Sequence, residues 1–389
     1  MTKVARTPAA AEPWVNVRRM RPRRVSAFLP IILSMLAFAD AAHAQQGLTV
    51  GADVIFYGDN TEFQNPFREG ETIFGASGRL DGRVEMSDAV TLSLGVFGNS
   101  RFGGDSFELV RPVIAMTVTS GPSRFIFGTI ATPVVGEPRG PDRTGPHGLL
   151  PPLQRETLAF DRPYEAGLQW TLKGPAYEHD TWLQWQRLNT PEHRERLDAG
   201  ARVQWRMGGP FSLPVQMHIV HEGGQLHASG PVRDSVAVAT GIALSPRPRD
   251  SASGSGPREQ PIVVLTPSIE VLGLWSHDTP DREQPQRTRN GGAFFARAAV
   301  EGLAWRAHLI VWRGDDFIKS EGDPNYMSIR RDGSRYRGVR DYAEAGIART
   351  FALAPGALIE ASFRFHRVER DYEYSYRILG VVRARARLK

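Results

Sequence analysis

The last stretch of the chain, residues 374–388, constrains the fold most strongly, because its side chains alternate with a period of two. One set of positions carries no charge, and the other set carries four arginines. A period of two belongs to a β-strand, in which successive side chains point to opposite faces. Wound as a helix, Arg383, Arg385 and Arg387 would fall on different sides and leave no apolar stripe. The stretch therefore predicts a strand with one apolar and one charged face.

The same alternation recurs from residue 48 to the end of the chain and predicts about sixteen strands, within a range of fourteen to eighteen. No segment keeps a helical period for longer than two turns, so the sequence predicts an all-β chain. The predicted strands are 48–57, 73–84, 89–97, 107–119, 124–131, 164–173, 178–188, 197–207, 211–221, 233–244, 262–276, 292–301, 303–313, 341–350, 357–368 and 374–388.

The connections between these strands alternate between short turns and long polar loops. Two connections break the rhythm, because 246–260 is long where a short turn is expected and 369–373 is short where a long loop is expected. Alternating short and long connections are typical of an up-and-down barrel in an outer membrane, with short turns in the periplasm and long loops outside. The sequence thus predicts a single closed antiparallel transmembrane β-barrel over residues 45–389.

A membrane explains why one face of each strand is apolar. About ten residues of a tilted strand span the hydrocarbon layer, and most predicted strands have this length. An arginine at the middle of the lipid face would cost roughly 2–4 kcal/mol, so the arginines should point into the lumen. The alternative is a soluble periplasmic β-sandwich or propeller, whose strands also alternate. That alternative gives no reason for the rhythm of the connections, and no repeat of propeller length is present.

Residues 1–44 are predicted to be a signal peptide. Three arginines within 21–24 precede the apolar run 25–39, which leads to an Ala-His-Ala site at 42–44. A membrane anchor is the alternative, but the run is shorter than the ~20 residues that a spanning helix needs. Met20 is a second candidate for the start of translation.

The charge of the chain lies largely in this signal peptide. Seven of the 48 Lys and Arg residues and two of the 42 Asp and Glu residues fall within 1–44, which leaves 41 basic and 40 acidic residues. This balance gives no support to nucleic-acid binding. The absence of cysteine excludes disulfides, thiolate metal sites and a lipidated N-terminal cysteine. No cofactor or metal site is expected, since His218 and His221 would point to opposite faces of a strand.

The pattern over residues 45–389 resembles that of Gram-negative outer-membrane β-barrel proteins, in particular the porin-like ones. This resemblance implies passive diffusion of small solutes, contact with outer-membrane lipid, insertion by the barrel-assembly machinery, and a homotrimer. The chain departs from the pattern at its end, Leu388-Lys389, where such barrels usually carry an aromatic residue.

The long connection 132–163 is the first candidate functional segment. It contains Leu149, Leu150 and Leu153, which make it too apolar for a loop that extends into solvent. In the porins that the chain resembles, the third extracellular loop folds inward and narrows the pore; a rigid external cap is the alternative. The candidate lumenal charges of this constriction loop are Arg155, Glu156, Asp161 and Arg162.

A basic lumen wall is the second candidate. Closure of the barrel would place the last strand beside the first two, and rings of arginine favour anions in pores. Alternatively, Asp53, Asp81 and Glu360 neutralise the arginines in ladders of ion pairs, each worth little. The candidate selectivity residues are Arg377, Arg383, Arg385, Arg387, Arg79 and Arg83.

From these features we expect a channel for small polar solutes, with anions favoured, that works without catalytic residues and is not an enzyme. One alternative is an outer-membrane barrel enzyme that acts on lipids, which would need a Ser/His pair near the rim. Another is a closed barrel that serves adhesion, polysaccharide export or envelope structure. No G-x-S-x-G motif is present, and nothing in the sequence brings a serine and a histidine together.

Overall fold

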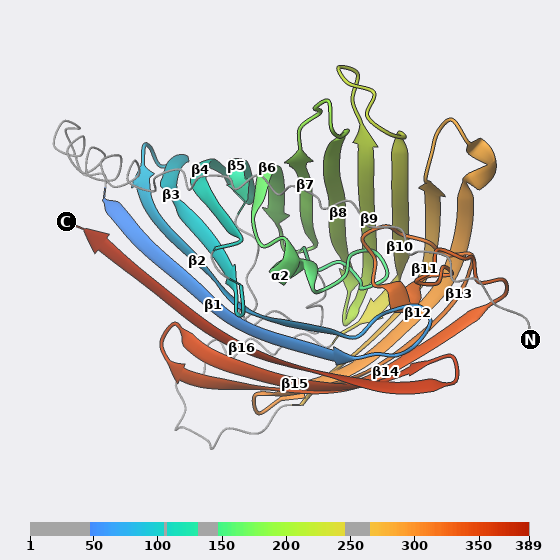
Figure 1. Cartoon of the computed structure of the whole chain (residues 1–389). Helices are drawn as coiled ribbons and strands as arrows, with labels where there is room; N and C mark the ends of the chain where they lie inside the picture. The colour runs from blue at the N-terminus through green and yellow to red at the C-terminus, as the bar shows by residue number, and fades with distance from the viewer. Residues whose placement is uncertain (1–46, 105–106, 131–146, 246–264, 389) are drawn as a thin grey trace, which may run out of the picture. The chain divides into compact units, whose positions relative to one another are not determined.

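Sixteen antiparallel strands form one closed barrel in the computed structural model of the chain (Figure 1). The structure describes residues 47–104, 107–130, 147–245 and 265–388. Each strand pairs with its neighbours in sequence, and β1 pairs with β16 to close the ring. The strands are β1 Leu48–Glu62, β2 Glu71–Glu85, β3 Val90–Arg101, β4 Leu109–Ser120, β5 Ser123–Ile130, β6 Glu165–Lys173, β7 Tyr177–Arg187, β8 Glu195–Gly208, β9 Phe211–Gly223, β10 Arg233–Leu244, β11 Thr266–Thr279, β12 Arg289–Gly302, β13 Trp305–Asp315, β14 Arg340–Ala354, β15 Ala357–Val368 and β16 Asp371–Leu388.

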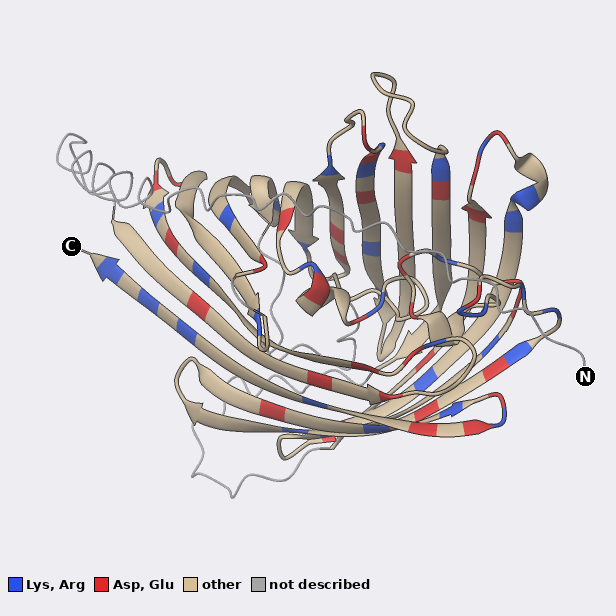
Figure 2. Cartoon of the chain, in the orientation of Figure 1, with Lys and Arg blue, Asp and Glu red and all other residues tan. Residues whose placement is uncertain are grey.

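Strand β16 shows how the two faces of the wall differ. Its outward side chains Tyr374 and Ile378 are 44% and 55% exposed, whereas Leu379 and Val381 on the inward face are 1% and 3% exposed. Its arginines lie on the inward face with Leu379, and Figure 2 shows their bands repeated along the strand. The wall is therefore apolar towards lipid and charged towards the lumen, as the alternation predicts.

The predicted fold class is confirmed, with all sixteen predicted strands present and most bounds shifted by a few residues. The short connection 369–373 is a tight hairpin in which only Glu369 and Arg370 join β15 to β16, and Glu369 adopts a φ of 57°. The long connection 246–260 lies outside the described residues. So do the predicted signal peptide 1–44 and the first part of the predicted constriction loop, 132–146.

The two ends of the barrel differ in their connections. Tight turns such as 121–122 and 303–304 lie at one end, and longer segments such as 224–232 and 316–339 lie at the other. Because outer-membrane barrels carry short turns in the periplasm, the end with the longer segments is the extracellular end.

Two extracellular segments, 147–163 and 316–339, fold inward and fill part of the lumen (Figure 1). Leu149, Leu150 and Leu153 are 0% exposed and belong to one apolar cluster with Phe317 of the second segment. Polar contacts fix their backbone, since Gln216 accepts a hydrogen bond from the Leu150 N–H at 2.7 Å. We call these two segments the plug.

The helices of the described ranges are short, and none is long and apolar enough to cross a membrane. The plug carries α2 Leu158–Asp161 and the 3-10 helix η4 Pro324–Tyr326. A second 3-10 helix, η3 Pro285–Arg287, lies between β11 and β12.

Candidate active site

Four neighbouring strands, β14, β15, β16 and β1, bring polar side chains to one patch of the lumen wall near its extracellular end. Residues two apart share the lumen face, so β15 presents Arg364 and His366, and β16 presents Ser375 and Arg377. The strand register places Glu344 of β14 opposite His366, and Arg364 opposite Ser375. Side chains that are far apart in sequence therefore meet at the seam where the barrel closes.

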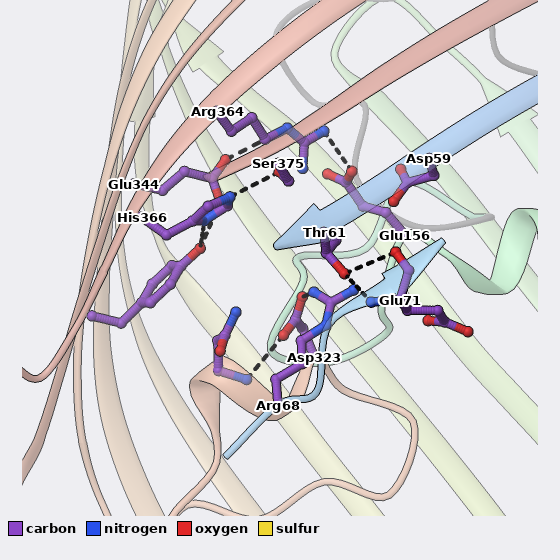
Figure 3. A network of polar contacts seen from close by, with 12 residues as sticks. Asp59, Thr61, Arg68, Glu71, Glu156, Asp323, Glu344, Arg364, His366 and Ser375 are labelled. Atoms are coloured by element: carbon purple, nitrogen blue, oxygen red, sulfur yellow. Dashed lines mark hydrogen bonds and ion pairs between the residues drawn. The ribbon is translucent and has the colours of Figure 1, made fainter. Parts of the chain in front are cut away.

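A chain of hydrogen bonds runs from Ser375 through His366 to Glu344 (Figure 3). His366 Nε2 lies 2.8 Å from Ser375 Oγ, and its Nδ1 lies 2.7 Å from the hydroxyl of Tyr342. Tyr342 donates to Glu344 Oε2 at 2.7 Å, so the Tyr342 oxygen can accept from His366 Nδ1–H. This tautomer, assigned from the hydrogen-bond network, leaves Nε2 free to accept the hydroxyl proton of Ser375.

Further contacts hold this chain in place. Glu344 Oε1 lies 2.7 Å from His308 Nε2, and Glu344 Oε2 lies 3.5 Å from His366 Nδ1. The Phe63 ring packs edge-on against His366 at a centroid distance of 4.9 Å. Ser375, His366 and Glu344 are all buried. Burial keeps bulk water away from the hydrogen bonds and strengthens their electrostatic interactions.

Cationic side chains surround the serine and histidine, and carboxylates neutralise them. Arg364 donates to Glu156 Oε2 at 2.6 Å, and Arg377 donates to the same oxygen at 3.0 Å. Arg377 also pairs with Asp59 of β1. Burial alone would raise the pKa of Glu156, but the two arginines outweigh burial and lower this pKa from 4.5 to about 2. The carboxylate of Glu156 is therefore ionised in the neutral pH range.

A second ion pair joins the loop before β2 to the plug. Arg68 NH1 lies 2.5 Å from Asp323 Oδ2. Burial alone would lower the pKa of Arg68, but Asp323 outweighs it and the pKa is raised. Figure 3 shows Arg68 beside Asp323, and the Glu156 carboxylate facing Arg364. The plug thus supplies counter-charges to the arginines around the serine.

A cavity of about 30 Å³ lies between these groups, and Ser375, His366 and Thr61 contribute to its lining. A buried water needs roughly 10–15 Å³ of such volume. The cavity therefore has room for about two waters and is too small for an acyl chain while the plug is docked.

The arrangement contains the parts that acyl transfer requires. A hydroxyl lies within hydrogen-bonding distance of a base, and the base is oriented on its far side by a third group. Arg364 lies opposite Ser375 across the strand pair, and a cation beside the nucleophile can stabilise negative charge on a substrate carbonyl. Within the described ranges, no group of three or more His, Asp or Glu residues could hold a metal ion.

The predicted constriction-loop residues lie in the plug. Glu156 reaches the active-site patch, as described above. Arg155 pairs with Asp161 at 2.9 Å, and Arg162 pairs with the buried Glu321 at 2.9 Å. These contacts join the parts of the plug to one another, and a role in narrowing a pore stays a prediction.

The predicted lumen arginines are divided between two places. Arg377 lies in the active-site patch, and the other five lie towards the periplasmic end with carboxylates beside them. Their role in selectivity stays a prediction. The ion pairs are Arg383 and Arg385 with Asp53 at 3.9 and 2.6 Å, Arg387 with Glu85 at 3.9 Å, and Arg79 and Arg83 with Asp81 at 3.5 and 2.7 Å.

Sequence reasoning missed Ser375, His366, Tyr342 and Glu344. The usable signal was the short connection 369–373. A tight hairpin there pairs residues that are equally distant from the turn, which brings His366 and Ser375 to neighbouring positions on one face.

Comparison with known families adds a functional assignment. The chain matches the family model described as "Lipid A 3'-O-deacylase-type" over residues 39–389. Similar solved structures include outer-membrane expressed OmpT of Vibrio cholerae, with 10% identity, a TM-score of 0.51, and coverage of 88% of this chain and 99% of that one. An anion-selective porin from Comamonas acidovorans has 8% identity, a TM-score of 0.50, and coverage of 87% and 100%. No curated protein sequence matches the chain.

The solved structures support the fold alone, and they agree with a Gram-negative outer-membrane β-barrel. The prediction that the chain is not an enzyme is wrong, because the family that matches most of its length is named for a deacylation activity. The alternation could not reveal this, since lumen-facing residues look equally polar in a channel and in an active site.

Proposed function

The chain belongs to the lipid A 3'-O-deacylase-type family, and on that premise we propose that it hydrolyses an acyl ester of lipid A in the outer membrane. Ser375 is the nucleophile, His366 is the general base, and Glu344 orients His366 through Tyr342. The observation that carries this proposal is the contact of 2.8 Å between Ser375 Oγ and His366 Nε2. The seam of the barrel places this contact near the extracellular end, on the side where lipid A resides.

The reaction follows the usual course of ester hydrolysis by a serine. Ser375 Oγ attacks the carbonyl carbon while His366 Nε2 takes the hydroxyl proton. Tyr342 and Glu344 stabilise the imidazolium, and Arg364, which is paired with Ser375 across the strands, stabilises the developing oxyanion. His366 then returns the proton to the departing sugar oxygen. Water hydrolyses the acyl-serine with the same histidine as base, and a fatty acid is released.

Substrate entry requires the plug to move, because the closed cavity of about 30 Å³ is too small for an acyl chain. Glu156 lies between Arg364 and Arg377, where an anionic group of a phosphorylated glycolipid would bind in its place. We infer that displacement of the Glu156 carboxylate opens the cavity and makes both arginines available for the substrate. The docked plug is then the resting state of the enzyme.

The test uses purified full-length protein folded in detergent, incubated with lipid A, with mass spectrometry to detect loss of one acyl chain. Ser375→Ala and His366→Gln should each lower the rate by about a thousandfold or more, as removal of a nucleophile or its base does in serine hydrolases. Ser362→Ala is the matched control, because Ser362 lines the same cavity on the neighbouring strand and is not assigned a role.

Heat-modifiable gel mobility confirms that each variant is folded. If Ser375→Ala deacylates lipid A at the rate of the Ser362→Ala control, Ser375 is not the nucleophile. If folded wild-type protein removes no acyl chain from lipid A under any condition that loosens the plug, the proposed substrate is wrong.

A further inference from the structure

A second cavity lies in the lumen near the periplasmic ends of β1–β5, on residues that the active-site patch does not use. Its volume is about 330 Å³, and its lining contains three arginines, Arg79, Arg83 and Arg124. The tight turns 86–89 and 121–122 adjoin it, so it lies at the opposite end of the barrel from Ser375. The cavity is large enough for an organic molecule and not only for water.

The charges in this cavity do not balance. Arg79 and Arg83 share one carboxylate, that of Asp81, which is 1% exposed and therefore lies behind the cavity surface. Arg124 stands across from them on β5. Among the residues that the structure describes, it forms no ion pair with a carboxylate, and its charged neighbours are Arg79 and Arg83. The remaining acid of the lining, Glu85, is exposed and lies 3.9 Å from Arg387.

Hydroxyl groups complete the lining. The strand register places Ser93 opposite Arg83, Thr119 opposite Arg124, and Thr91 opposite Thr117. The Nε of Arg79 is buried and has no hydrogen-bond partner within the described part of the chain. Three arginines and several hydroxyl side chains thus line one space. Such a set matches the oxygens of a phosphate group, which guanidinium groups can bind with two parallel hydrogen bonds.

We propose that this cavity binds the phosphate group of a small, water-soluble phosphorylated compound that enters from the periplasmic end. The lining is polar and faces the lumen, which favours a soluble compound over a lipid. The unbalanced charge of Arg124 supplies the attraction, and the hydroxyls of Ser93 and Thr119 supply hydrogen bonds to phosphate oxygens. This site is independent of the proposed deacylation, because it shares no residue with the active-site patch.

Isothermal titration calorimetry on the folded protein in detergent tests the proposal, with glucose 6-phosphate as the probe and glucose as its neutral counterpart. We expect binding of glucose 6-phosphate alone, with an affinity that falls as salt is added. Arg124→Gln should weaken binding by about tenfold or more, the loss expected for one charge-assisted hydrogen-bonding group. Asp81→Asn should strengthen binding, because it removes the negative charge that Arg79 and Arg83 share.

Arg370→Gln is the control, since it removes one arginine charge from the exposed turn between β15 and β16. Heat-modifiable gel mobility shows that Arg124→Gln is folded, whether or not the protein deacylates lipid A. The proposal is refuted if glucose 6-phosphate binds no better than glucose, or if Arg124→Gln binds it as tightly as Arg370→Gln does.

Discussion

Replacing Glu156 by glutamine tests whether one carboxylate of the plug holds the active site closed. The Glu156 carboxylate accepts hydrogen bonds from Arg364 at 2.6 Å and from Arg377 at 3.0 Å, and its side chain is only 13% exposed. These contacts lower its pKa from 4.5 to about 2. At 1.36 kcal/mol per pKa unit, the ionised carboxylate stabilises the docked plug by about 3 kcal/mol. The docking equilibrium of Glu156→Gln should therefore shift by on the order of a hundredfold towards the open state.

The pH dependence has a definite sign. The pKa of Glu156 is lower in the docked plug than in the open state, so its stabilisation is fully present above pH 4.5. It declines as the pH falls from 4.5 towards about 2, where the docked carboxylate is protonated as well. Glu156→Gln cannot titrate, and plug opening in this variant should lack this acid-induced step.

Hydrogen exchange of residues 147–163, followed by mass spectrometry, measures the opening directly. In Glu156→Gln these amides should exchange up to on the order of a hundredfold faster at neutral pH, and kcat/KM on lipid A should rise. Glu192→Gln makes the same chemical change at an exposed loop position and should alter neither quantity. If exchange in 147–163 is the same in the two variants, the ion pairs of Glu156 do not hold the plug and the proposed resting state is wrong.

Two further predictions concern histidines. The first tests the contact of His366 in the active site, and the second tests the proton of His147 in the plug. Tyr342→Phe removes the hydroxyl between His366 and Glu344. In steady-state kinetics on lipid A, kcat should therefore fall by about ten- to a hundredfold with KM little changed. A change in KM alone would contradict this prediction. Burial lowers the pKa of His147, but Glu165 and Asp180 outweigh burial and raise it from 6.5 to about 10. Protonated His147 therefore stabilises the docked plug. This stabilisation is fully present below pH 6.5 and is lost as the pH rises through 10. Amide hydrogen exchange at residues 147–150 of the wild type should therefore accelerate between pH 6.5 and pH 10. An equal acceleration in His147→Gln would exclude loss of the His147 proton as its cause.

The strands could be predicted because the signal for them is local. Hydrocarbon requires an uncharged side chain at every second position, and this requirement holds along each strand whatever its neighbours are. Two strands, β10 and β15, have the predicted bounds at both ends. The apolar residues Leu149, Leu150 and Leu153 were also informative, because burial is the ordinary fate of such a run. What these leucines pack against depends on tertiary structure and could not be predicted.

The active site could not be predicted because it depends on register. Ser375, His366 and Glu344 lie on three different strands, and each looks like an ordinary polar residue of a lumen face. Only the pairing of Glu344 with His366, and of Arg364 with Ser375, brings them together. A shift of one residue in either pairing would turn one of the partners towards the lipid. Function therefore rests on contacts across strands, about which a period of two along one strand says nothing.

The arginines of β16 show the same limit on a single strand. Arg377 and Arg385 occupy equivalent positions of the alternation, on the same face. Arg377 lies beneath the plug and shares Glu156 with Arg364, whereas Arg385 lies towards the periplasmic end and pairs with Asp53. The role of an arginine depends on the carboxylate or substrate group that it contacts. Arg377 therefore belongs to the active-site patch, and Arg385 belongs to the ion pairs near the periplasmic end. The arginines that the alternation predicts as one basic lumen wall are thus divided into two groups, because the plug, within the described ranges, contacts only those near the extracellular end.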